Sequence, residues 1–121
     1  MTPLDRLREI CLRLPESTET NFGGHEDHPT FRVRNKIFGF YGRSDRDDER
    51  VAVWCKAAPD VAGELVASDP ERFYVPPYLG SKGWVGVWLA PGEPDWDEVA
   101  ELVLDSYRLV APKRLAAQLD E

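Results

Sequence analysis

The sequence predicts a single α+β domain with a largely antiparallel sheet and helices packed on one face. A chain of 121 residues suits one hydrophobic core. Helical and strand-like apolar patterns follow one another along it, and most connections between neighbouring strand patterns are too short for parallel crossovers. With 42% hydrophobic residues, the chain can bury a core without disulfides. We therefore treat residues 1–121 as one domain.

Four helices are expected, and each has a recognisable beginning or end. Thr2 before Pro3 begins the first, and Asp95 with Glu98 forms a capping box before the strongest amphipathic stripe. Pro-containing breakers delimit the others. The expected limits are residues 2–15, 59–69, 95–110 and from 112 onward.

Strand patterns occupy the intervening segments. Residues 30–41 alternate and are divided by a predicted turn at Asn35, so they predict a pair of antiparallel strands. Further strands are expected at residues 51–56, 73–75 and 84–89. Residues 17–21 form a polar segment to which no strand is assigned, while residues 43–50 carry seven charged groups and predict a solvated turn.

The net charge of −7 opposes long-range attraction to nucleic acids and anionic membranes. Six acidic residues and no basic residue lie within residues 93–105, however. The remaining 108 residues hold 15 basic and 16 acidic groups, so a local basic face is compatible with the composition.

The two cysteines, Cys11 and Cys55, have apolar neighbours, which is typical of reduced core thiols. No run of about 18 apolar residues and no export signal is present. We expect a cytoplasmic protein without membrane association.

No pattern in the chain predicts catalysis. The segment His25-Glu26-Asp27-His28 contains metal-ligating residue types, but its histidines are three apart between glycines and a proline, which favours a polar loop. No serine lies in a nucleophile elbow, and no phosphate-binding glycine loop has the required spacing. We assign no catalytic residue, metal or cofactor, and an enzyme is the least favoured class.

The most informative pattern is a short basic stripe formed by Arg32, Arg34 and Lys36, which alternate with Phe31 and Val33. Period-two geometry predicts these cations on one sheet face. Arginine matches the geometry of phosphates and carboxylates, so the stripe predicts an anion-binding surface. The alternative is a solvated face whose arginines pair with the protein's own carboxylates.

Three further residues extend this candidate surface. Lys56 and Lys82 could add positive charge, and Tyr78 is the aromatic residue most expected to be exposed, where it could pack on a sugar or base. Trp88 and Trp96 are expected in the core.

The chain resembles the MmcQ/YjbR family of small bacterial proteins over nearly its whole length. The resemblance is carried by HPTFRVRNKIF at residues 28–38, VWCKAAP at 53–59, DPERFYVPPYLG at 69–80, GWVGV at 83–87 and SYRLVAP at 106–112. Asn35 stands where relatives commonly carry glycine, and both residues tolerate left-handed backbone.

The resemblance implies a CyaY-like, or frataxin-like, α+β arrangement. It also implies DNA binding, because family members are commonly described in this way from a double-wing likeness of fold. In this interpretation, Arg32, Arg34 and Lys36 would contact phosphates. An equally weighted alternative is a module that binds a protein or a small anion through the same face, which the negative net charge favours.

Overall fold

Six strands pair in the order β1-β2-β3-β4-β6-β5, and every pairing is antiparallel. The computed structural model describes residues 2–21, 29–43, 50–58, 60–76, 83–90 and 92–119. The strands are β1 (Ser17–Asn21), β2 (Pro29–Val33), β3 (Lys36–Arg43), β4 (Val51–Lys56), β5 (Phe73–Tyr74) and β6 (Trp84–Ala90). The helices are α1 (Pro3–Leu12), α2 (Val61–Ser68), α3 (Trp96–Val110) and α4 (Lys113–Gln118).

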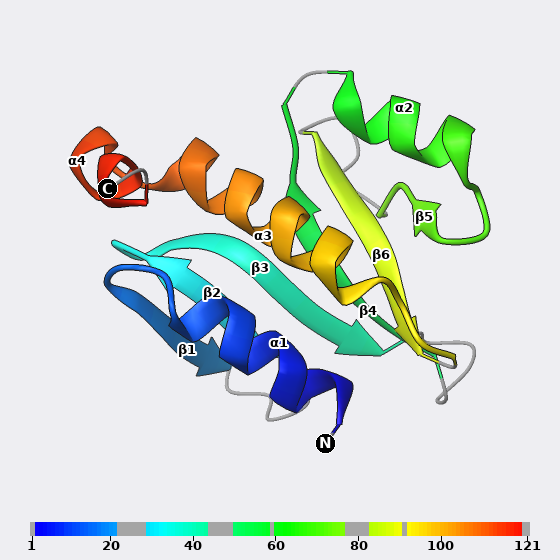
Figure 1. Ribbon diagram of the computed structural model, residues 1–121, viewed down its shortest axis with the longest axis horizontal. Helices are drawn as coiled ribbons and strands as arrows, with labels where there is room; N and C mark the ends of the chain where they lie inside the picture. The colour runs from blue at the N-terminus through cyan, green and yellow to red at the C-terminus, as the bar shows by residue number, and fades with distance from the viewer. Residues whose placement is uncertain are drawn as a thin grey trace.

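Helices α1 and α3 cover one face of the sheet (Figure 1), and the core lies between them and the strands. Phe31, Val53 and Val87 from the strands and Val103 and Tyr107 from α3 are almost fully buried there. The predicted α+β class is confirmed. Among the residues that the structure describes, none of the helices has the length and apolarity needed to cross a bilayer.

The helix beginnings follow from local side-chain chemistry. The Thr2 side chain accepts a hydrogen bond from the Asp5 N–H, and the Asp5 carboxylate accepts one from the Thr2 N–H. At α3, the Asp95 carboxylate accepts from the N–H groups of Asp97 and Glu98. These bonds satisfy amide groups that have no partner within the helix.

Residues 17–21, to which no strand was assigned from the sequence, form the edge strand β1. It pairs with β2 from Ser17 opposite Val33 to Asn21 opposite Pro29. An edge strand has one neighbour and a largely solvated surface, so it needs no apolar alternation. Glu19 points to the helical side, where the Arg8 guanidinium of α1 holds its carboxylate with an Nε–Oε1 distance of 2.8 Å.

The β2–β3 hairpin turns over Arg34 and Asn35, with φ values of 52° and 66°. Two consecutive left-handed residues make the turn whose twist matches an antiparallel pair. The expected turn at Asn35 is thus present. The expected tip at residues 43–50 falls largely outside the described residues.

Candidate functional site

The sheet face turned away from α1 and α3, here called the open face, carries aromatic and cationic side chains. Side chains alternate between faces along a strand, and directly paired residues share a face. The register therefore places on the open face the pairs Arg32 with Ile37, Phe40 with Trp54 and Lys56 with Trp84. None of the described strand residues on this face is acidic.

Strands β3 and β4 separate at one end of the sheet. The β2–β3 pairing continues to Val33 opposite Lys36, whereas the β3–β4 pairing ends at Gly39 opposite Cys55. A bulge between these points leaves Phe38 without a residue opposite it on β2. Figure 1 shows β3 curving away from β4 beyond this point.

A serine from α3 joins the two strands where they separate. The Ser106 hydroxyl donates a hydrogen bond to the Phe38 carbonyl over 2.7 Å and accepts one from the Lys56 N–H over 2.9 Å. Ser106 is fully buried. Its hydroxyl thus takes the place of the strand partner that each backbone group lacks. Nothing local in the sequence identified Ser106 as a bridging residue.

The separated strands leave an open hollow of about 460 Å³, here called the basic hollow. It is lined by cations from three strands, Arg32 of β2, Lys36 of β3 and Lys56 of β4. Its other lining residues are Asn35, Ile37, Trp84, Leu109 and Val110. Among the described residues, no carboxylate lines the basic hollow. The charged side chains that line it are therefore all positive.

Arg32 is oriented by a buried threonine. Its Nε–H donates to the Thr30 hydroxyl over 3.1 Å, and that hydroxyl donates to the Thr20 carbonyl over 2.6 Å. Thr30 is fully buried, so its position is fixed. The terminal amino groups of the guanidinium form no ion pair with any carboxylate of the described residues, and neither do Lys36 and Lys56. They remain available for an external anion.

Arg34 is held differently from the other predicted cations. The hairpin turn interrupts the alternation after Val33, and the Arg34 guanidinium binds the Glu16 carboxylate through two contacts of 2.9 and 3.3 Å. Its charge is therefore compensated within the chain. Tyr78, Lys82 and the segment from His25 to His28 lie outside the described residues.

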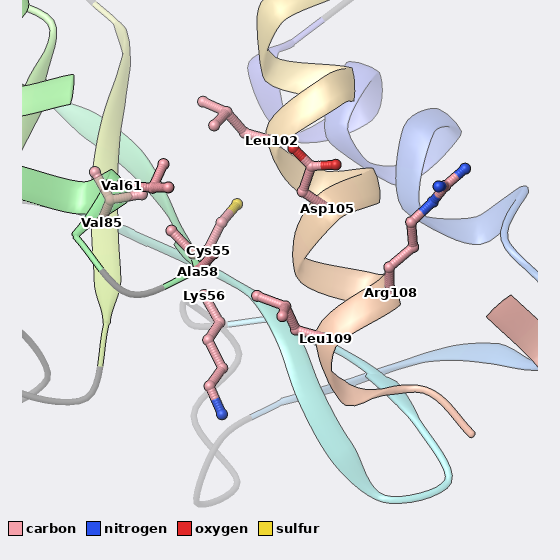
Figure 2. Close-up of a pocket in the computed structure, with 10 residues that line it drawn as sticks. Cys55, Lys56, Ala58, Val61, Val85, Leu102, Asp105, Arg108 and Leu109 are labelled. Atoms are coloured by element: carbon pink, nitrogen blue, oxygen red, sulfur yellow. The ribbon is translucent and has the colours of Figure 1, made fainter. Parts of the chain in front are cut away.

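A second hollow of about 250 Å³ adjoins the first, because Lys56 and Leu109 line both. Figure 2 shows the Cys55 sulfur directed toward α3 and the Lys56 side chain extending the opposite way. Burial raises the pKa of Cys55 to about 12, so its thiol is protonated at neutral pH. The thiolate that a nucleophile requires is not formed there.

Most aromatic side chains of the open face are stacked in two pairs. The ring centroids of Phe40 and Trp54 are 5.1 Å apart, and those of Tyr74 and Trp88 are 4.5 Å apart. The Trp54 indole N–H donates to the Tyr74 hydroxyl over 2.5 Å. Trp88, which we expected in the core, is thus half-buried on the opposite face. Trp96 does pack against the core.

Comparison with known proteins places these features in a family. A family model described as YjbR matches residues 12–109. The chain belongs to the YjbR family. The resemblance predicted from the sequence is confirmed.

The fold is shared with solved structures. Protein DR2400 of Deinococcus radiodurans, which has a DUF419 domain, superposes with a TM-score of 0.75 at 27% identity, over 98% of this chain and 91% of that one. A Pseudomonas syringae protein superposes with a TM-score of 0.69 at 16% identity, over 87% of this chain and 96% of that one. Among curated proteins, none matches this sequence.

Proposed function

We propose that this YjbR-family protein binds nucleic acid through the basic hollow, where Arg32, Lys36 and Lys56 contact phosphate groups. The observation that carries the proposal is the convergence of three cations from three strands on one hollow without a lining carboxylate. The planar guanidinium suits bidentate contact with phosphate, and the lysines supply mobile point charges. Arg34 is left out of this contact set because Glu16 already neutralises it.

The excess acidic charge does not prevent such binding, because most of it lies at the other end of α3. Leu109 and Val110 line the basic hollow at the carboxyl end of this helix. Glu101 lies about 12 Å from Leu109 along the axis at the helical rise per residue, and the other acids of residues 93–101 lie farther away. The screening length at physiological salt is about 8 Å. Asp105 is closer and lines the adjoining hollow.

Fluorescence anisotropy with a labelled oligonucleotide tests the proposal. If three phosphates are neutralised, the logarithm of affinity falls with the logarithm of salt at a slope of about −2.7 for duplex or −2.1 for single strands. Arg32→Gln and Lys56→Gln should each weaken binding and flatten the slope by about 0.7 to 0.9. Arg6→Gln also removes one positive charge, but at the amino-terminal end of α1, and should leave binding nearly unchanged.

Two results would contradict this function. One is the absence of binding at about 50 mM salt. The other is an equal effect of Arg6→Gln and Lys56→Gln, which would show that only net charge matters. A purely structural role, in which the lysines balance the partial negative charge at the carboxyl end of α3, predicts lower thermal stability of Lys56→Gln with unchanged anisotropy.

A small anion is the second candidate ligand, favoured by the size of the basic hollow. Its volume of about 460 Å³ lies within the range of about 300 to 1,000 Å³ typical of small-molecule sites. Calorimetric titration with inorganic phosphate distinguishes this candidate. Saturable phosphate binding that Arg32→Gln abolishes, with no oligonucleotide binding, would support it over nucleic acid.

A further inference from the structure

Trp84 is the aromatic residue among the described residues that line the basic hollow. It lies at the start of β6, directly opposite Lys56, and is half-buried. Among the described residues, the Trp84 side chain has no ring, hydrogen-bond or cation partner. Trp54, Trp88 and Trp96 each have at least one such partner. The Trp84 ring therefore has a different role from the other three.

The backbone holds Trp84 in a fixed position. The preceding residue, Gly83, has a φ of 87°, and a Cβ there would lie 3.0 Å from the Ala57 carbonyl oxygen. The Ala57 N–H donates to the Gly83 carbonyl over 2.8 Å. Only glycine adopts this conformation at this close approach without strain. The start of β6 is thus tied to the end of β4, so the backbone of Trp84 is positioned beside the basic hollow before any ligand binds.

We propose that the basic hollow accepts one unpaired nucleotide, with its base stacked on Trp84 and its phosphate on Arg32, Lys36 and Lys56. The ligand is then single-stranded nucleic acid rather than a duplex. This inference rests on the proposed function and deepens it. A base within a duplex has both faces covered by its neighbours, whereas an unpaired base can offer one face to an indole.

The other described aromatic residues of the open face already have ring partners within the protein, which makes Trp84 the preferred position for a base. Phe40 and Trp54 are already stacked on each other, as are Tyr74 and Trp88. The Arg50 guanidinium lies over the Trp88 ring, with its carbon 3.7 Å from the ring centroid. At least one face of each of these four rings is therefore occupied within the protein, whereas the Trp84 ring has no such partner among the described residues.

Anisotropy with an oligothymidylate of about twelve nucleotides, the matching oligouridylate, and a duplex of the same length tests the inference. The single strands should bind more tightly than the duplex. Trp84→Ala should weaken single-strand binding about 5- to 150-fold, the range expected for loss of one stacked base. Trp84→Phe should retain most of the affinity, because it keeps an aromatic face. A preference between oligodeoxyuridylate and oligouridylate, which differ only in the 2′-hydroxyl, identifies DNA or RNA as the ligand.

Two controls separate stacking from folding. Phe40→Leu removes an aromatic ring from the same face outside the basic hollow, and should change affinity less than twofold in a variant whose circular dichroism is native. An abasic oligonucleotide tests stacking on the unmodified protein and should show the same loss as Trp84→Ala. This second measurement decides the question even if the alanine variant does not fold.

The outcomes distinguish the inference from the function on which it rests. If the duplex and the abasic strand bind as well as oligothymidylate, while Arg32→Gln and Lys56→Gln weaken binding, stacking on Trp84 is wrong and phosphate binding stands. If no oligonucleotide binds, both are wrong. If Phe40→Leu weakens binding as much as Trp84→Ala, the assignment of the base to Trp84 is wrong.

Discussion

Replacing Ser106 with alanine removes the hydroxyl that joins β3 to β4 at the basic hollow. The Phe38 carbonyl then loses a donor, and the Lys56 N–H loses its acceptor. Leaving a buried backbone group unpaired costs about 1 to 3 kcal/mol. The Phe38 bond is fully buried and the Lys56 bond partly so, which gives a combined loss of about 2 to 3 kcal/mol.

Urea denaturation followed by circular dichroism measures this loss. With a denaturant slope of about 2 kcal/mol per molar, the midpoint should fall by about 1 to 1.5 M. Ser68→Ala is the matched control, because the Ser68 hydroxyl is exposed and bonds only the Leu65 carbonyl of its own helix. It should change the free energy of unfolding by less than about 0.5 kcal/mol. Equal stabilities of the two variants would refute the bridging role of Ser106.

Three further substitutions or conditions test the fold around the site. A Cβ at Gly86 would overlap the Tyr74 ring, so Gly86→Ala should lower the free energy of unfolding by about 1 to 3 kcal/mol and alter the near-ultraviolet circular dichroism; an unchanged spectrum would contradict this packing. Burial raises the pKa of Cys55 to about 12, whereas an unfolded thiol titrates near 8.5. The native state then holds a proton that the unfolded chain releases, so stability should fall as pH rises from about 8.5 toward 12. At pH near 8, a thiol reagent should label Cys55 only after unfolding, which mass spectrometry of the labelled peptide can verify. Asn35 has a left-handed backbone, so Asn35→Ala should be less stable than Asn35→Gly by about 1 kcal/mol in thermal melts; the reverse order would argue against the turn.

The local elements were predictable because their signals lie within a few neighbouring residues. Capping residues and an apolar stripe predicted α3, and a turn-forming residue between two alternating segments predicted the β2–β3 hairpin. The edge strand β1 was missed because a polar strand with one neighbour has no such signal. The prediction that Trp88 lies in the core was wrong for a related reason. Both faces of β6 are apolar, so alternation alone cannot tell which face the helices cover.

The amino-acid sequence alone determined the family, the fold class and the identity of the cationic residues. Only the tertiary structure decided which of those cations meet, because that depends on strand register and on where a pairing ends. Arg32 and Lys56 are distant in sequence and lie on strands that do not pair, and a serine from α3 joins the intervening β3 to β4 where those two strands separate. Likewise, Arg34 is neutralised by Glu16 of a segment that no local pattern connects to the hairpin. Coulombic interactions act through space, so their partners follow from the fold and not from spacing along the chain.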